Sequence, residues 1–469
     1  METIAQQSNL LDRFNKWLGE SITIKLFSIG FLVIVLLIPA NWIQEIIEER
    51  QQRADEVIAE ISDKWSGSQT VTGPVLVIPY RNIKTIDRGE NGIETREEIV
   101  KAFFLPEQMT INGSVKPEMR RRGIFDAVVY ESDMQVKSLF NQPDFKSLSI
   151  PEEAVLWDGA YISFGVTDLR GISANPQFVN GDASLTTEPS NDIGVTVRTK
   201  KDDTVGKTSQ RADHISRSGV VAKLNWEGPE SFKSNIDITL KLKGSKQLHF
   251  VPVGKTTSVT LKSPWKDPSF DGEFLPATSE VNDEGFQAAW NVLHFNRPFS
   301  QQWTGTGQEL GSADFGVRLL IPVDQYQKSI RTSKYGVLII LLTFIALFLV
   351  EITQKVRIHP FQYILIGAAL IIYYTLLLSI SEHTGYNIAY IIASSATVIL
   401  LGLYSSSFLG DKRLAALFAS LVAAFYAFVF TIIMQQDLSL LIGSIGLFVI
   451  ISLLMFFSRK INWYKQANV

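Results

Sequence analysis

The chain has 469 residues, a formal net charge of −3 and no cysteine. The lack of cysteine excludes disulfides, thiolate catalysis and cysteine-ligated zinc, and the charge balance shows no basic surplus of the kind that binds nucleic acid. The mean hydropathy is only +0.12, because apolar residues are concentrated in segments 26–43 and 335–457, whereas most charged residues lie between them. We therefore expect an integral membrane protein with a large polar insert.

Six stretches are apolar and long enough to cross about 30 Å of hydrocarbon as helices. No small-residue cleavage site follows the first stretch, so we expect an uncleaved anchor rather than a signal peptide. The linkers among the last five are short, which predicts an antiparallel helical bundle. The predicted spans are residues 26–43, 335–352, 361–380, 386–409, 414–434 and 438–457.

The distribution of lysine and arginine among the short linkers predicts the orientation of the spans. Segments 381–385 and 435–437 contain no lysine or arginine, whereas segments 1–25, 353–360, 410–413 and 458–469 do. Because positive charge is retained on the cytoplasmic side, both termini are predicted to be cytoplasmic and residues 44–334 to lie outside.

The periodicity of the outer segment changes from helical to strand-like. Residues 44–66 predict an amphipathic stalk helix that continues the first span. In segment 236–243 apolar and polar residues alternate, and Gly244-Ser245 is predicted to form a hairpin turn. Further strand signals occur at 75–80, 102–104, 127–130, 259–261 and 315–323.

These signals predict a mainly-β, sandwich-like domain over residues 67–334. Its length allows one lobe, two lobes or a sandwich with an insertion. The polar segment 197–218 has almost no apolar period and is expected to be a mobile excursion. The predicted fold is thus a bundle of six transmembrane helices, arranged as one plus five, with a large β-domain outside the membrane.

No motif in the sequence indicates catalysis. Two Gly-Lys-Thr triplets, at 206–208 and 254–256, lack the earlier glycine of a phosphate-binding loop. The five histidines show no metal-ligand spacing, and no G-x-S-x-G motif is present. We therefore expect no catalytic residue, no metal and no cofactor, and a protein that is not an enzyme.

The predicted spans carry no ionisable residue near their centres, which argues against ion-coupled transport. Glu351 lies near the cytoplasmic end of the second span. Its carboxylate is expected to reach the lipid headgroups or to pair with Lys355 at i+4.

Several stretches together are similar to one known family. They are "GPVLVIPY" (73–80), "DLRGI" (168–172), "PSFDGEFLP" (268–276), "EGFQAAW" (284–290), "DQYQ" (324–327), "HPFQY" (359–363) and "SEHTGYNIAYIIAS" (381–394). In this order they resemble the CreD family of Gram-negative inner-membrane proteins, whereas segment 190–233 departs from the family pattern.

The resemblance implies an inner-membrane protein with one anchor, a large periplasmic domain and a C-terminal bundle of helices. It also implies a role in cell-envelope integrity and a link to the Cre sensor kinase and response regulator. It supplies no catalytic residue.

Glu382 and His383 interrupt the apolar tract between the third and fourth spans. The predicted topology places them in the outer turn, where Gly385 frees the backbone. One interpretation is an interfacial turn in contact with headgroups. The other is a docking or partner site, formed with Asp324 and Tyr326, in which His383 can change charge near neutral pH.

Three functions remain open at this point. The first is a non-enzymatic protein that supports envelope integrity or the envelope stress response through a periplasmic β-domain. The second is a transporter or channel component, and the third is a periplasmic glycan hydrolase with carboxylates dispersed in the sequence. The expected partners are the lipid bilayer, a periplasmic or inner-membrane protein, and a peptidoglycan or lipid ligand, but no nucleic acid.

Overall fold

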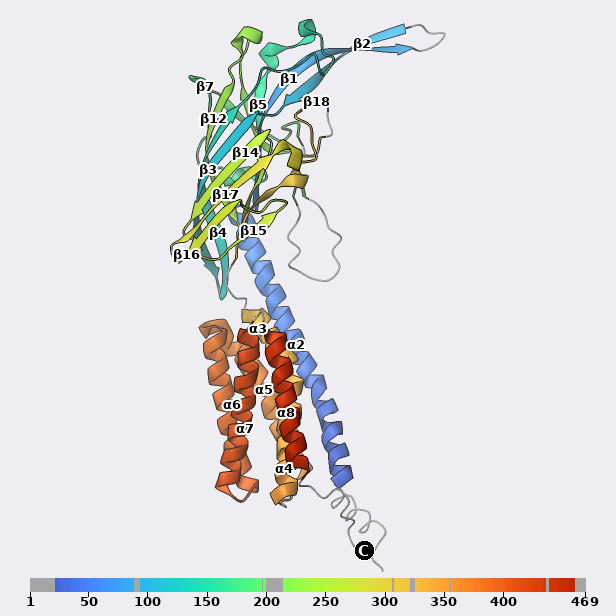
Figure 1. Ribbon diagram of the computed structural model, residues 1–469, viewed down its shortest axis with the longest axis vertical. Helices are drawn as coiled ribbons and strands as arrows, with labels where there is room; N and C mark the ends of the chain where they lie inside the picture. The colour runs from blue at the N-terminus through green and yellow to red at the C-terminus, as the bar shows by residue number, and fades with distance from the viewer. Residues whose placement is uncertain are drawn as a thin grey trace, which may run out of the picture. The chain divides into compact units, whose positions relative to one another are not determined.

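The chain divides into two compact units (Figure 1). The computed structural model describes residues 22–87, 93–195, 197–199, 214–305, 308–320, 325–354, 356–435 and 438–459. The helical unit comprises residues 1–53 and 323–469, and the β-unit comprises residues 54–322. Helix α2 (Ile22–Trp65) is continuous over 44 residues and contributes to both units. It therefore includes both the predicted first span and the predicted stalk.

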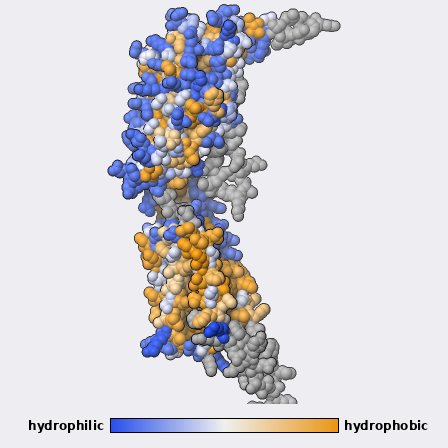
Figure 2. Space-filling model, viewed as in Figure 1, coloured by the Kyte–Doolittle hydropathy of each residue, from blue (hydrophilic) through white to orange (hydrophobic). Residues whose placement is uncertain are grey.

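Six described helices are long and apolar enough to cross a membrane, as the sequence predicts. A short polar helix, α3 (Gln325–Lys334), precedes the second of them and belongs to the helical unit, although the sequence places it at the end of the β-domain. Apolar side chains cover the visible face of the helical unit (Figure 2). The six helices are α2, α4 (Gly336–Gln354), α5 (Pro360–Thr384), α6 (Tyr386–Phe408), α7 (Lys412–Met434) and α8 (Ser439–Ser458).

The β-unit contains two large sheets. The first has the order β15-β19-β13-β1-β5-β11-β8, and β2 and β18 extend it from β1. Its strands are β15 (Pro268–Gly272), β19 (Phe315–Leu319), β13 (Gln247–Val251), β1 (Gln69–Asp87), β5 (Tyr161–Val166), β11 (Gly219–Lys223), β8 (Thr187–Ser190), β2 (Ile93–Phe104) and β18 (Gln302–Thr304).

The second sheet has the order β16-β17-β14-β3-β4-β12-β6-β7. Its strands are β16 (Thr278–Asn282), β17 (Gly285–Leu293), β14 (Thr256–Ser263), β3 (Gln108–Arg122), β4 (Phe125–Leu139), β12 (Asn235–Ser245), β6 (Gln177–Asn180) and β7 (Ala183–Leu185). Four predicted strand segments fall within β1, β2, β4 and β14, and the fifth, 315–323, overlaps β19 up to Leu319, which confirms a mainly-β region.

Both sheets contribute to one continuous hydrophobic core. In β12 the apolar residues from Ile236 to Leu242 are each 1% exposed, and the polar residues between them face outward. Trp290 of the second sheet packs against Phe315 of the first, with ring centroids 5.7 Å apart. Because the core is shared, the β-unit is one lobe rather than two.

The predicted hairpin at Gly244-Ser245 is wrong. Strand β12 continues through both residues to Ser245, where it still pairs with β4. The chain then turns at Lys246, which has a φ of 63°, and enters β13 in the other sheet. Gly244 is instead required because a Cβ there would overlap the ring of Tyr130.

The structure describes only the two ends of the polar segment 197–218. Strands β9 (Val197–Thr199) and β10 (His214–Ser216) pair as a two-stranded ribbon. Residues 200–213, on which the prediction of a mobile excursion depends, lie outside the described residues.

The turn at Lys246 yields a prediction about stability. Its positive φ costs a lysine about 1 kcal/mol that glycine does not pay. Lys246→Gly should therefore raise the free energy of unfolding by about 1 kcal/mol, measured by urea denaturation of the full chain in detergent with tryptophan fluorescence. In the control, Lys262→Gly within β14, stability should fall by roughly 0.5–1 kcal/mol. Destabilisation by Lys246→Gly would contradict the assigned turn.

Candidate functional site

Helix α3 turns a polar face toward the other helices of its unit. Tyr326, Lys328, Ser329 and Thr332 are its buried residues. The hydroxyl of Tyr326 donates a hydrogen bond to Oε1 of Glu382 at 3.3 Å. Burial, reinforced by the negative charge of Glu382, raises the pKa of Tyr326. The structure thus brings together two of the four residues proposed from the sequence.

The other two residues are placed differently. Asp324 lies outside the described residues, and the His383 side chain is exposed. Glu382 and His383 are not in a turn, because α5 continues to Thr384 and only Gly385, with a φ of 79°, separates it from α6. The contact between Tyr326 and Glu382 joins α3 to α5 within the helical unit, so a docking role for these residues stays a prediction.

Glu351 is buried at the end of α4, where its carboxylate makes three contacts. It accepts hydrogen bonds from Nζ of Lys25 at 2.6 Å, from the Tyr363 hydroxyl at 3.0 Å and from the Ile358 backbone N–H at 3.2 Å. Only 4% of the Glu351 side chain is exposed. The carboxylate therefore does not extend to the headgroups, contrary to that expectation. It holds the ends of α2, α4 and α5 together, and Lys355 lies outside the described residues.

The β-unit fastens the last turn of α2 through a buried network centred on Gln69. The Gln69 amide nitrogen donates to Ser66 Oγ at 2.7 Å, to the Asp168 carbonyl at 3.0 Å and to the Lys243 carbonyl at 3.1 Å. Its oxygen accepts from the Asp168 N–H at 3.1 Å. The "DLRGI" stretch therefore has a structural role, because the backbone of Asp168 is hydrogen-bonded to the Gln69 side chain where α2 ends and β1 begins.

Cations surround the same end of α2. The guanidinium of Arg120 and the ammonium of Lys243 each lie over the Trp65 ring, 4.6 Å from its centroid. Glu60 pairs with Arg122 at 2.6 Å, and hydrogen bonds from Arg122 and Lys64 lower the pKa of Glu60 to about 2. Together with the Gln69 network these contacts fix the helix end to strands β3 and β12.

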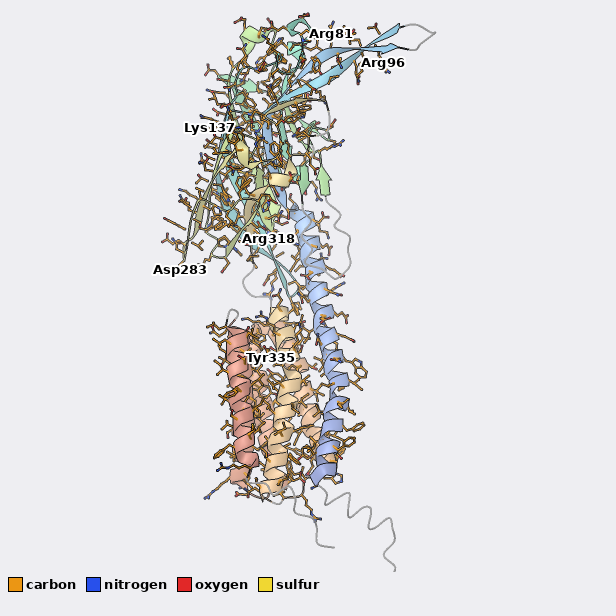
Figure 3. All side chains as sticks on the ribbon, turned by 45° about the vertical axis from the view of Figure 1, so that its right-hand side comes forward. Arg81, Arg96, Lys137, Asp283, Arg318 and Tyr335 are labelled. Atoms are coloured by element: carbon orange, nitrogen blue, oxygen red, sulfur yellow. The ribbon has the colours of Figure 1, made fainter. Side chains whose placement is uncertain are left out.

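A second polar cluster lies at the edge of the first sheet and is centred on His249 of β13. Its Nδ1 is 2.8 Å from Oδ2 of Asp314, and its Nε2 is 2.8 Å from Oδ1 of Asp271. Arg318, labelled in Figure 3, pairs with the other oxygen of Asp271 at 3.0 Å. His249 is only 6% exposed, so the cluster is a chain of alternating charges within the β-unit.

Glycine makes this arrangement sterically feasible. His249 in β13 and Asp271 in β15 both lie opposite Gly316 of the intervening strand β19. A Cβ on Gly316 would lie 2.8 Å from the His249 ring. Because residue 316 has no side chain, the imidazole can pass over β19 and reach the carboxylate on the far strand.

The geometry defines what His249 can do. Both ring nitrogens face carboxylate oxygens, so the doubly protonated imidazolium satisfies both contacts. Burial alone would lower the pKa of His249, but hydrogen bonds and charge from Asp271 and Asp314 outweigh it and raise the pKa to about 8. With both nitrogens occupied, the ring is not available as a general base or metal ligand, and no group of three potential metal-binding residues occurs in the described segments.

Sequence reasoning missed this cluster because its members are 22 and 65 residues from His249. The local signal was an aspartate near a glycine in two places, Asp271-Gly272 and Asp314-Phe315-Gly316. Such pairs are common in turns, so they did not indicate a shared partner.

The two units define a class of protein, a membrane protein with several candidate spans that carries a large β-sandwich. The family model described as Inner membrane protein CreD matches residues 21–464. The chain is also 32% identical over 444 residues to Inner membrane protein CreD of Escherichia coli (strain K12), covering 94% of this chain and 93% of that protein. The chain belongs to the CreD family of inner-membrane proteins, which confirms the resemblance seen in the sequence.

The His249 cluster predicts a pH-dependent stability. The folded-state pKa of about 8 exceeds the value of 6.5 for an unperturbed histidine, so protonation stabilises the folded state by about 2 kcal/mol. This contribution is complete below about pH 6.5 and is lost as the pH rises through about 8. Urea unfolding at pH 6 and pH 9.5 should show the loss, and His249→Gln should abolish it, whereas His294→Gln should not. An unchanged pH slope in His249→Gln would contradict the assignment.

The Gln69 network predicts a local stability effect. Gln69 is 0% exposed, and Gln69→Ala leaves Ser66 Oγ and the backbone groups of Asp168 and Lys243 without this partner. We expect a loss of about 3 kcal/mol in unfolding free energy, since each unsatisfied buried group costs about 1–3 kcal/mol. Amide hydrogen exchange at Ser66 and Gly67 should accelerate, whereas the exposed control Gln135→Ala should leave it unchanged; equal exchange in both variants would refute the role of Gln69.

Proposed function

We propose that this chain is a non-enzymatic inner-membrane protein that supports cell-envelope integrity or the envelope stress response. In this proposal the β-unit faces the periplasm, where it binds an envelope partner. Membership of the CreD family supports the inner-membrane location. The lysine and arginine pattern of the short linkers supports an orientation with both termini cytoplasmic and residues 44–334 periplasmic.

The observation that carries the binding proposal is an open trough on the outer face of the second sheet. Four adjacent strands, β14, β3, β4 and β12, contribute its lining. We name it the sheet trough, and its outward-facing side chains are Asn112, Ser114, Asp133, Gln135, Thr239, Lys241, Thr260 and Lys262. Polar residues predominate over the visible surface of the β-unit (Figure 2).

The trough extends further along the same sheet. Ser114 and Lys262 also line a second hollow beside β16 and β17, together with Glu280, Asn282 and Gln287. Amide, hydroxyl and charged groups along one face suit an extended polar ligand, because each can donate or accept a hydrogen bond. A glycan strand or a protein segment fits this lining better than a lipid tail does.

The charge state of Asp133 favours binding over hydrolysis. Asp133 pairs with Lys116 at 3.0 Å and with Lys241 at 3.6 Å. The hydrogen bond from Lys116 lowers the pKa of Asp133, and the smaller effect of burial does not reverse this. A glycosidase acid needs a raised pKa, so Asp133 is suited to contact a ligand and not to protonate one.

Single cysteines test this proposal, since the chain has none of its own. In intact cells a membrane-impermeant maleimide should label Thr384→Cys but not Lys412→Cys. A crosslinker attached at Thr239→Cys or Gln135→Cys should capture a specific envelope protein or peptidoglycan fragment. The exposed control Lys146→Cys should not capture it.

Each outcome separates the candidate functions. The reverse labelling pattern would overturn the orientation. Equal products from the trough and from Lys146→Cys would remove the support for partner binding and favour the transporter alternative, whereas cleaved glycan products dependent on the trough would favour a hydrolase.

A further inference from the structure

The short polar helix α3 lies at one end of the helical unit (Figure 1). It leads through Tyr335 directly into α4. Its side chains contact Tyr386, the first residue of α6, Met434, the last residue of α7, and Glu382 in the last turn of α5. These four helices are candidate membrane spans. With them in a bilayer, α3 lies at the level of the lipid headgroups, where the spans meet water.

Lys328 of α3 is buried at this end and has no counter-charge in the described part of the chain. It is 9% exposed. Its ammonium lies 5.5 Å from the centroid of the Tyr386 ring, and its only described hydrogen-bond partner is Sδ of Met434 at 3.7 Å. A thioether sulfur is a weak acceptor, whereas an ammonium has three N–H donors. Most of the hydrogen-bonding capacity of Lys328 is therefore unused.

The polar side chains near Lys328 are already engaged with other groups. Thr332 Oγ1 donates to the Lys328 carbonyl at 2.8 Å. Because the single hydroxyl hydrogen of Thr332 is used there, the Tyr386 hydroxyl donates to Thr332 Oγ1 at 2.6 Å. Glu382 accepts from the Tyr326 hydroxyl, and among the described residues no carboxylate contributes to the charge balance of Lys328.

A buried ammonium is costly without an anion beside it. Burial disfavours the charged form and lowers the pKa of Lys328. The Tyr386 ring offsets part of the cost through a cation–π contact, but a ring carries no net charge. An anion would supply the missing charge and accept the free N–H groups, as buried charges require.

The ammonium lies close to the surface, where an anion can reach it. Met434 is only partly buried, and the following Gln435 is exposed. A methionine side chain is unbranched and has three rotatable bonds, so Met434 can move aside while the backbone of α7 stays in place. On α3 itself, Gln327 and Arg331 beside Lys328 are exposed. The site can therefore be entered from the end of the helical unit.

The charges of α3 favour a particular kind of anion. Its 10 residues include Lys328, Arg331 and Lys334 but no aspartate or glutamate. Arg331 follows Lys328 by about one helical turn, so both side chains can contact one anion that has several oxygens. Lysine and arginine are common partners of phosphate, and phosphates are the anions of the headgroup level of a membrane. A phosphate group therefore fits this position best.

We propose that Lys328 binds a phosphate group at the end of the helical unit, beside Tyr386 and Met434, with Arg331 at the rim of the site. The phosphate belongs to an anionic phospholipid or to a soluble phosphate compound, which share the chemistry that Lys328 recognises. The site has no residue in common with the sheet trough, so the proposal holds whether or not the trough binds a ligand.

The unfolding midpoint of the full chain in detergent tests the proposal. The probes are phosphatidylglycerol, phosphatidylcholine and inorganic phosphate, the last compared with chloride at equal ionic strength. A ligand that binds only the folded state raises the midpoint. A rise with phosphatidylglycerol alone would identify a lipid headgroup, and a rise with inorganic phosphate would identify a soluble compound; either supports the site. Phosphatidylcholine, whose phosphate is paired with its own cation, should give no rise.

Substitutions on α3 connect the response to the site. Lys328→Met replaces the ammonium by an apolar group of similar length. It should weaken the apparent affinity for the effective probe about tenfold, as expected for the loss of one charge-assisted hydrogen bond. Arg331→Gln, at an exposed position that does not endanger folding, should weaken it about threefold. The control Lys334→Met removes an exposed lysine of the same helix and should respond as the wild type does.

Three results would overturn the proposal. In the first, no probe raises the midpoint of the wild-type protein. In the second, Lys328→Met and Arg331→Gln both respond with the wild-type affinity, which would make Lys328 a core residue without a ligand. In the third, Lys334→Met weakens the affinity as much as Lys328→Met, which would assign the response to the general positive charge of α3.

Discussion

The β-unit depends on the hydrogen bonds that join the end of α2 to the strands that follow it. A helix end exposes carbonyl groups without partners, and the turn that follows must be satisfied before a strand can begin. Gln69 meets this constraint because one side chain serves Ser66, Asp168 and Lys243 at once. Gly171 completes the site, since a Cβ there would overlap the Gln69 amide. Strand β1, which pairs with β13, β2 and β5 in the first sheet, starts from this point.

Buried charge is used in the same way in both units. Glu351 in the helical unit and His249 in the β-unit are each held by oppositely charged partners at 2.6 and 2.8 Å. Removing either partner would leave an uncompensated buried charge, which is strongly destabilising. A group whose atoms are already held by such partners has few left with which to bind another ligand. The two most conspicuous ionisable clusters therefore join strands and helices.

Sequence patterns predicted what depends on local periodicity and failed where distant segments meet. The six spans and the strands of the β-unit follow from runs and alternation of apolar residues. The hairpin at Gly244-Ser245 was wrong because alternation does not reveal which strand is the neighbour. The contacts of His249 span three strands, and the inward face of α3 is polar, so neither left a hydrophobic signal. Of the proposed site residues, the structure joins Tyr326 to Glu382.

The two units expose different surfaces, apolar in the helical unit and polar in the β-unit, and each surface suits a different kind of ligand. In the helical unit polar groups such as Tyr326 and Glu351 are turned inward, and exposed apolar side chains such as Ile372 face outward. In the β-unit the apolar residues form the core, and amide, hydroxyl and charged groups line the sheet trough. In the proposed function a polar envelope ligand contacts the sheet trough, whereas the outward face of the helical unit offers contacts to apolar groups.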